Sequence, residues 1–363
     1  KLAKELARDQ KDRNDLRGMV VYDLTRDREL LNYNGNKYFI PASTVKLFTF
    51  YTAYSILPDS VLSLEYLERG DSLVIRGAAD PSVLLDEEDR VVEFLRTWKE
   101  KIFLVDSSIE DSKYGPGWSW DDYESSYMPE RSLMPLYGNL LTLTLEDSLR
   151  VVPEFFRESL SVEGRDTEPS GWKNSYRDMN RNRFYPGKLK RGEQKSIPFI
   201  TSNQLTADLL GEALGKKVTL VPDDFEVDFE NLLTRSYDSL YTQMLVESDN
   251  FIAEQLMLQI GSKVQNEYRV KSAIEYALDS LVNDVPQRPR WVDGSGLSRY
   301  NLFTPESMVY LLEKMHHEIP ANRLLGYLAQ GGVSGTLESH FKGPLGEPYV
   351  FAKSGSLSNN YCL

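Results

Sequence analysis

The sequence contains few of the residues on which several protein classes depend. Its 363 residues include one cysteine, Cys362, so the chain can form neither an internal disulfide nor a cysteine-rich metal site. It also lacks a run of about 18 apolar residues, which a transmembrane helix requires. Residues 40–57 come closest, but Pro41, Ser43 and Lys46 interrupt them. The first residues have no apolar region of a secretion signal, so we expect that any signal peptide was removed or never present.

Basic residues are also in deficit. The chain has 42 Lys and Arg against 55 Asp and Glu, which gives a formal net charge of −13. A nucleic-acid partner is therefore not expected, because phosphate binding needs a basic surface. With 41% hydrophobic and 27% charged residues, the composition is typical of a folded protein. The length of 363 residues predicts two or three domains.

Histidine is scarce as well. A Ser-His-Asp hydrolase would have to use His316, His317 or His340, the three histidines of the chain. His316 and His317 end a predicted helix, where a positive charge complements the helix dipole, and His340 lies in a polar segment. We interpret all three as structural, so a nucleophile in this chain needs another base.

The expected elements are similar at the two ends of the chain and different in the middle. Periodicity predicts helices over residues 1–13, 43–56, 87–100, 231–246, 250–261, 267–282 and 305–317. Short strands are predicted over residues 18–24, 30–33, 72–76, 131–145 and 349–353. The polar residues 161–196 predict a small irregular module.

This order of elements predicts one α/β domain that is interrupted by a large insertion. The outer domain combines residues 1–66 and 226–363, the inserted domain combines residues 67–147 and 205–225, and residues 148–204 form a nested module. No internal repeat or low-complexity tract indicates another organisation.

Patterns for metal and nucleotide binding are missing. No grouping of His, Asp and Glu has the spacing of metal ligands. Gly211–Lys216 is one residue too short for a phosphate loop. Residues 332–336 are not a nucleophile elbow, because Thr336 replaces its second glycine. We therefore expect no metal and no cofactor.

A serine and a lysine three residues apart remain as candidates for chemistry. Ser43 and Lys46 open a predicted helix, on which positions i and i+3 share one face. The same spacing follows Ser170 and Ser339, but neither of these precedes an apolar helix. Only at Ser43 could the free backbone N–H groups of a helix start bind an oxyanion.

Two further triplets follow Ser43 in the chain. Ser248-Asp249-Asn250 lies between two predicted helices, and Lys353-Ser354-Gly355 ends the last predicted strand. Each has a plainer explanation, since Ser248 and Asp249 could cap a helix and Lys353 could be an ordinary charge at a strand end. The three motifs together resemble those of penicillin-binding proteins and class A β-lactamases.

The spacing of the motifs narrows this resemblance. About 200 residues separate Lys46 from Ser248, several times the gap in a compact β-lactamase. The long insertion resembles that of the D-alanyl-D-alanine carboxypeptidase/endopeptidases of the PBP4 type, peptidase family S13. Segments of similar sequence to this family are residues 77–81, 116–122, 292–299 and 335–337, so the likeness spans nearly the whole chain.

The resemblance implies a fold and a location. The fold would be an α/β (α+β) β-lactamase/transpeptidase-like domain, an antiparallel sheet flanked by helices, with a large inserted region before Ser248. Members of the family continue beyond the position of Leu363 with further strands and a helix. We expect this catalytic domain to lack them, through truncation or disorder, and we expect export to the bacterial periplasm or cell envelope.

The chemistry requires a base that activates Ser43. Lys46 serves only if its pKa falls from the free value of about 10.4, through partial burial and a nearby cation such as Lys353. The resemblance implies that Ser248 relays the proton to the leaving amine and that Asn250 holds the substrate amide. It also implies an oxyanion hole formed by the backbone N–H groups of Ser43 and Ser356.

Substrate recognition follows from the resemblance too. Lys353, Ser354 and Ser356, around Gly355, would hold the terminal carboxylate of D-Ala-D-Ala. Ser354 replaces the more frequent Thr but keeps the hydroxyl. Asp122 would bind the ammonium of the diamino acid in the stem peptide, and Arg299 its carboxylate. A solvated loop acid and a structural ion pair are the plainer explanations for Asp122 and Arg299.

The predicted function is thus a serine D-Ala-D-Ala carboxypeptidase or endopeptidase. Its partners would be peptidoglycan stem peptides, with β-lactam antibiotics as inhibitors that acylate Ser43. A β-lactamase is an alternative, but no Glu suited to activate a deacylating water follows Ser248-Asp249-Asn250. A silent peptidoglycan-binding module is a second alternative, although such a module would typically have lost Ser43 or Lys46.

Overall fold

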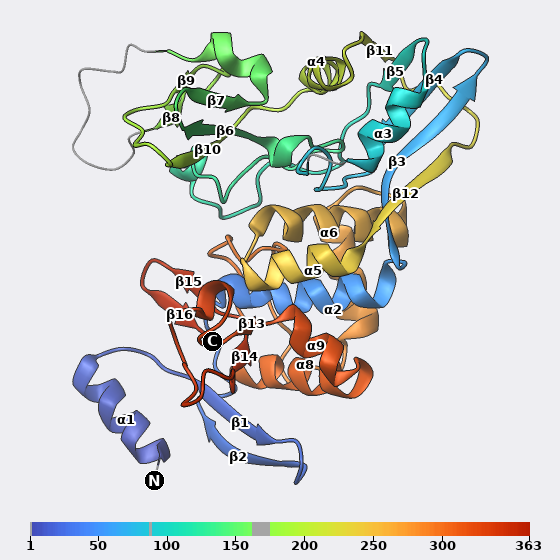
Figure 1. The fold of residues 1–363 in the computed structure, drawn as a ribbon. Helices are drawn as coiled ribbons and strands as arrows, with labels where there is room; N and C mark the ends of the chain where they lie inside the picture. Colours follow the sequence, from blue (N-terminus) through green and yellow to red (C-terminus); the bar gives the residue numbers. More distant parts are fainter. Residues whose placement is uncertain (1, 87–88, 162–174) are drawn as a thin grey trace.

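Two hydrophobic cores organise the protein, whose computed structural model describes residues 2–86, 89–161 and 175–363. The first core is helical and forms the lower half of Figure 1. It gathers side chains from α2 (Lys46–Ile56), α5 (Tyr237–Val246), α6 (Asn250–Gln265), α7 (Val270–Tyr276), α8 (Pro305–Glu318) and α9 (Ala321–Tyr327). None of the described helices is long and apolar enough to cross a bilayer.

Helices α2 and α6 lie at the centre of this core. Every residue of α6 from Phe251 to Gly261 is buried, and so is every residue of α2 from Lys46 to Ala53. A helix that is buried on all sides must pack against neighbours around its whole circumference, and α2, α5 and α7 surround α6. The first residues of α2 and α6 lie side by side, which places the two helix starts at one point of the molecule.

The strands of this half form antiparallel pairs. After α1 (Leu2–Arg13), β1 (Met19–Asp23) pairs with β2 (Arg28–Tyr33), in agreement with the predicted hairpin. Near the end of the chain, β13 (Ala329–Gln330) pairs with β14 (Phe351–Ala352), and β15 (Gly355–Leu357) pairs with β16 (Asn360–Cys362). Strand β15 packs against the short 3₁₀ helix η1 (Ala42–Val45) that leads into α2.

The second core belongs to the middle of the chain and forms the upper part of Figure 1. Its five-stranded sheet has the order β11 (Val218–Val221), β5 (Ile102–Val105), β4 (Ser72–Gly77), β3 (Ser60–Arg69) and β12 (Glu230–Ser236). A three-stranded sheet has the order β10 (Gln194–Pro198), β6 (Leu140–Leu145) and β7 (Leu149–Val152). The remaining elements are α3 (Arg90–Thr97), α4 (Asn203–Leu214) and the pair β8 (Tyr176–Arg177) and β9 (Phe184–Tyr185).

Strands β3 and β12 connect the two cores. Strand β3 follows α2 and β12 precedes α5, and the two strands pair antiparallel along the edge of the five-stranded sheet. A large insertion therefore leaves and rejoins the helical half at one place. The domain boundaries near residues 66 and 226 stay a prediction.

Several predicted elements differ from the structure. The helix expected over 231–246 begins only at Tyr237, because residues 230–236 pair with β3 and the Ser236 side chain caps α5. The helix expected over 267–282 ends at Tyr276 and continues as one π-helical turn. Of the strand region expected over 131–145, only β6 is extended. Part of the predicted module 161–196 and part of the predicted helix 87–100 lie outside the described residues.

Close packing between α6 and the segment that leads into α7 gives a first prediction. A Cβ atom on Gly261 would lie 2.3 Å from the backbone oxygen of Arg269 and 2.7 Å from that of Glu267. Gly261→Ala should therefore lower the free energy of unfolding by about 2 kcal/mol, as overpacked cores do. Gly326→Ala is the control, because that helical glycine faces open space and alanine favours the helix by about 0.5–1 kcal/mol. Urea unfolding of both variants measures the difference, and equal stability would contradict the packing of α6 on residues 267–269.

Candidate active site

The turn that carries Ser43 is held between two glycines. Ser43 lies within η1 and does not cap α2, because the N-cap position of α2 is Val45 and no side chain caps it. Ala42, the residue before Ser43, has a positive φ of 49°. A Cβ on Gly296 would lie 2.0 Å from the Ala42 oxygen, and one on Gly355 would lie 3.0 Å from the Ser43 nitrogen. Only glycine permits this approach of both backbones, which fixes the position of the serine.

Lys46 reaches from the first residue of α2 to three acceptors. Its Nζ donates to Ser43 Oγ at 3.0 Å, to Asn250 Oδ1 at 2.6 Å and to the Ser295 backbone oxygen at 2.5 Å. The side chain is fully buried. The structure thus brings together Ser43, Lys46 and Asn250, which are distant in the sequence but were predicted as one site.

Burial makes the Lys46 ammonium unusually acidic. Loss of water lowers the pKa of Lys46 to about 8, although the carboxylates of Asp293, Asp249 and Glu254 act in the opposite direction. Burial also lowers the pKa of Lys353 to about 6, and the charge of Lys46 adds to this effect. Between about pH 6 and pH 8 the two lysines therefore share one positive charge, and without a ligand Lys46 is the more basic of the two.

Lys353 contacts the predicted Ser248-Asp249-Asn250 motif. Its Nζ donates to Ser248 Oγ at 2.8 Å and to the Ser354 backbone oxygen at 2.7 Å. Asp249 caps α6 by accepting from the backbone N–H of Ile252, so the plain explanation is correct for this residue. Ser248 has a positive φ of 63° and binds the lysine, so the motif is more than a helix cap.

Asn250 connects the lysine to the inserted part of the chain. Its amide oxygen accepts from Lys46, and its Nδ2 donates to the backbone oxygen of Tyr127 at 2.9 Å. Both hydrogen bonds fix the orientation of the amide group, since only the oxygen can accept from an ammonium.

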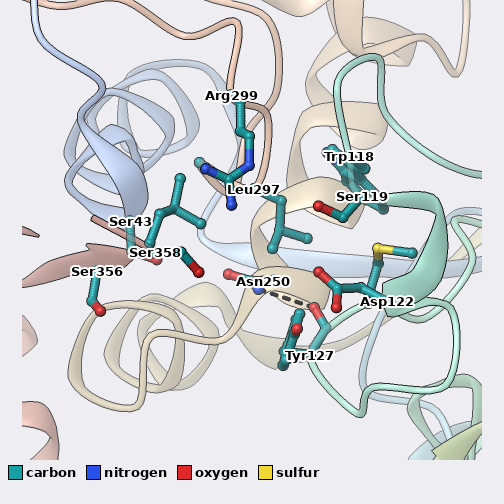
Figure 2. A pocket seen from close by; sticks show the side chains of 13 residues that line it. Ser43, Trp118, Ser119, Asp122, Tyr127, Asn250, Leu297, Arg299, Ser356 and Ser358 are labelled. Carbon is teal, nitrogen blue, oxygen red and sulfur yellow. Dashed lines mark hydrogen bonds between the residues drawn. The ribbon is translucent and has the colours of Figure 1, made fainter. Parts of the chain in front are cut away.

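A cavity of about 300 Å³ opens beside Ser43 (Figure 2). It is lined by Ser43, Trp118, Ser119, Asp122, Tyr127, Met128, Asn250, Gly296, Leu297, Arg299, Ser356, Leu357 and Ser358. Five of these residues were predicted from the sequence: Ser43, Asn250, Asp122, Arg299 and Ser356. Of the other predicted residues, Lys46 and Lys353 are buried behind this surface, and Ser354 donates to Thr336 Oγ1 at 2.7 Å.

Asp122 and Arg299 reach the cavity from different parts of the chain (Figure 2). Asp122 belongs to a 3₁₀ turn, η2 (Trp120–Asp122), in the inserted part and is half-buried. Arg299 lies in the segment that follows Gly296, and its side chain is exposed. The Asp122 carboxylate and the Arg299 guanidinium therefore both face the cavity beside Ser43.

Two buried carboxylates were missed by the sequence reasoning. Asp293 accepts from the backbone N–H groups of Gly296 and Ser298 at 2.9 and 2.6 Å, and from Trp118 Nε1 at 2.8 Å. Glu254 accepts from the backbone N–H of Ser295 at 2.7 Å. Asp293 stands in a segment that resembles the S13 family, and Glu254 lies four residues after Asn250 on α6, so a search for acids near the motifs could have found both.

The remaining candidates do not join the site. His316 and His317 lie in the last turn of α8, and neither they nor His340 line the cavity. Ser339 Oγ shares a hydrogen bond with His340 Nδ1, and Ser170 lies outside the described residues. Within the described part of the chain, no cluster of three or more His, Cys, Asp or Glu could hold a metal ion.

Comparisons with known sequences give one family. The profile of the D-Ala-D-Ala carboxypeptidase 3 (S13) family matches residues 1–150 and 235–363. The chain is 23% identical to D-alanyl-D-alanine carboxypeptidase DacB of Haemophilus influenzae, over 95% of the chain and 81% of that protein. It is 22% identical to penicillin-sensitive carboxypeptidase A of Dictyostelium discoideum, over 91% of the chain and 74% of that protein.

Comparison with solved structures gives the same class. The crystal structure of penicillin-binding protein 4 (dacB) from H. influenzae superposes with a TM-score of 0.76 and 19% identity, over 95% of this chain and 85% of that one. The same protein complexed with a β-lactam superposes with a TM-score of 0.68. The predicted fold class, the mixed α/β fold of the penicillin-binding enzymes, is thereby confirmed. The chain belongs to the D-Ala-D-Ala carboxypeptidase 3 (S13) family of serine peptidases.

Proposed function

We propose that Ser43 of this D-Ala-D-Ala carboxypeptidase forms an acyl-enzyme with peptidoglycan stem peptides and that Lys46 is its base. The observation that carries the proposal is the hydrogen bond between the buried Lys46 Nζ and Ser43 Oγ. Cleavage of stem peptides places the enzyme in the cell envelope, and in a bacterium with two membranes in the periplasm. The curated relatives with carboxypeptidase names support this assignment.

The acceptors around Lys46 explain how it works as a base. A neutral amine has two N–H groups and one lone pair. If the two N–H groups donate to Asn250 Oδ1 and to the Ser295 oxygen, the lone pair is left for the Ser43 hydroxyl. Neutral Lys46 then accepts the Ser43 proton as Oγ attacks the carbonyl carbon of the penultimate D-Ala.

The leaving group receives its proton on the other side of the site. When the C–N bond breaks, the departing D-Ala amine takes a proton from Ser248, which is replenished through its hydrogen bond with Lys353. The proton that Lys46 took from Ser43 replaces the one that Lys353 gave up, which leaves Lys46 neutral again. Water then attacks the ester on Ser43, Lys46 removes a proton from that water, and the same proton goes to Ser43 Oγ as the ester bond breaks. The acyl group leaves as a carboxylate, and Ser43 regains its proton.

Strand β15 would supply the groups that hold the reacting carbonyl and the terminal carboxylate. Gly355 lies against the backbone of Ser43, so the N–H groups of Ser43 and Ser356 lie on adjoining segments that border the cavity. Two such donors form an oxyanion hole, each contributing about 3 kcal/mol to lowering the barrier. The carboxylate would be bound by Lys353, Ser354 and Ser356, and its charge favours the protonated form of Lys353.

Asp122 and Arg299 would select the stem peptide. The third residue of a stem peptide is a diamino acid, which in many bacteria carries both an ammonium and a carboxylate. Asp122 attracts the first and Arg299 the second within the cavity beside Ser43. Of the alternatives, a silent binding module is disfavoured, because the contact between Ser43 and Lys46 is intact.

Acylation by penicillin tests the assignment of Ser43. Intact protein incubated with benzylpenicillin should gain one drug mass, and proteolysis should map it to the peptide with Ser43. Ser43→Ala should gain none and should stay folded. An adduct that persists in Ser43→Ala, or one on Ser170 or Ser339, would show that another serine is the nucleophile. Turnover of nitrocefin within seconds would favour the β-lactamase alternative.

The shared proton of the two lysines predicts a bell-shaped pH profile. Acylation needs neutral Lys46 as base and charged Lys353 for the carboxylate, and the carboxylate of the bound ligand draws the one positive charge of the pair from Lys46 to Lys353. The second-order rate constant with benzylpenicillin should therefore be highest between about pH 6 and pH 8 and fall by up to tenfold per pH unit on either side. Stopped-flow measurement from pH 5 to pH 10 provides the profile. A rate that still rises above pH 9 would mean that both lysines keep their ordinary pKa.

The proposed role of Asp122 predicts that its loss affects substrates with and without a free side-chain ammonium differently. Asp122→Ala should lower kcat/KM about tenfold for a stem peptide with a free side-chain ammonium, since a hydrogen bond between charged groups contributes about 1.5 kcal/mol or more. The same variant should change kcat/KM for diacetylated Lys-D-Ala-D-Ala by less than about twofold. Asp121→Ala is the control, because Asp121 is exposed and does not line the cavity. Equal losses on both substrates would show that Asp122 is structural.

A further inference from the structure

The backbone oxygen that accepts from Lys46 is itself held by a buried ion pair. Ser295 presents its oxygen to Lys46 Nζ at 2.5 Å, and its N–H donates to Glu254 Oε1 at 2.7 Å. Glu254 Oε2 accepts from Arg131 Nε at 2.9 Å and from Arg131 Nη2 at 2.5 Å. We propose that Glu254 and Arg131 are positioning residues for Lys46, acting through Ser295. This inference rests on the proposed role of Lys46 as the base.

Helix α6 positions two of the three acceptors of Lys46, the Asn250 oxygen directly and the Ser295 oxygen through Glu254. Asn250 is its first residue and contacts Lys46 directly, while Glu254 lies four residues later and therefore on the same face. A shift of α6 would move the Asn250 oxygen and, through Glu254, the Ser295 oxygen together. The lone pair of Lys46 is thereby aimed at Ser43 by one rigid, buried helix.

Arg131 opposes the effect of burial on the Glu254 carboxyl group. Both side chains are only 1% exposed, and burial raises the pKa of Glu254, whereas the charge of Arg131 is the largest effect that lowers it. As a carboxylate, Glu254 can only accept, which suits the Ser295 N–H and the two Arg131 donors. Both Arg131 donors converge on Oε2, which leaves Oε1 for the Ser295 N–H.

The inserted part of the chain supplies Arg131 and the ring that covers it. The Trp118 ring lies over the guanidinium at 5.1 Å, and its Nε1 donates to Asp293 at 2.8 Å. Arg131 Nη1 also lies 3.6 Å from Asp111. The segment that carries Asp122 is therefore anchored on both sides, at Trp118 and at Arg131, to residues that hold Lys46 in place.

The charges around Lys46 predict how the loss of Glu254 changes the pH profile. Asp249, Asp293 and Glu254 stabilise the ammonium form, Lys353 opposes it, and Arg131 lies behind Glu254. Replacing Glu254 by a neutral residue removes a negative charge, so the pH of fastest acylation should move to a lower value. Loss of the charge alone would move the optimum but leave the rate at the optimum unchanged, so the positioning role is measured by the rate of each variant at its own pH optimum.

The test compares Glu254→Gln with a matched control. Gln has the size of Glu, but one of its two oxygens is replaced by an NH2 group. That group would face a donor of Ser295 or Arg131, so one hydrogen bond would be lost. The acylation rate constant with benzylpenicillin should fall about 100-fold, as expected when a reacting group is misplaced by about 1 Å, and the pH optimum should fall by about half a unit or more. The control is Glu130→Gln, the neighbour of Arg131, a buried carboxylate that accepts from Lys113 and Thr201. It should lose thermal stability but keep the acylation rate within about twofold and the wild-type pH optimum.

Each outcome has a separate meaning. If Glu254→Gln, measured at its own pH optimum, loses no more acylation rate than Glu130→Gln, the positioning role is wrong. If the wild-type protein itself forms no penicillin adduct, the proposed function fails instead. Should Glu254→Gln not fold, Arg131→Lys replaces it, because lysine keeps the charge but has one nitrogen where the guanidinium donates from two. That variant should lose at least tenfold in rate, and an unchanged rate would overturn the proposal.

Discussion

The burial of one lysine is the constraint on which this structure depends. A buried ammonium is unfavourable unless it is surrounded by acceptors, and Lys46 has three within hydrogen-bond distance. These acceptors come from η1, from the start of α6 and from the segment after Asp293. The elements must therefore meet at one point, and the two central helices of the core begin there (Figure 1). The loss of water that makes the ammonium unfavourable is also what allows the amine to act as a base.

The insertion contributes to the chemical site rather than only covering it. Tyr127 accepts from Asn250, Trp118 donates to Asp293, and Arg131 pairs with Glu254. Buried charges of this kind add little net stability, because desolvation offsets the attraction. Their effect is to allow one arrangement of the segment from Trp118 to Arg131. The proposed recognition residue Asp122 lies in that segment, so substrate binding and the orientation of Lys46 share the same supports.

The sequence indicated which residues lie together better than which elements support them. Ser43 and Lys46 were distinguished from the other two pairs of this spacing by the apolar helix that follows them and by the two later triplets, and the structure joins them with Asn250. Residues 231–236 were predicted as helix because their pairing with β3, about 170 positions earlier, leaves no local signal. Arg131 and Glu254 could not be paired from the sequence, since 123 positions separate them. Their ion pair exists only because the insertion folds back onto α6.

The most direct test of the account is the titration of Lys46 itself. Nitrogen-15 labelling of lysine side chains, with assignment by loss of the signal in Lys46→Met, gives the protonation state of Nζ by NMR as the pH is raised. The account predicts that Lys46 titrates below pH 9, near the value of about 8 that burial imposes. A midpoint near 10.4, the value of a free lysine, would contradict it, because Lys46 would then be charged throughout the range in which the enzyme would have to act.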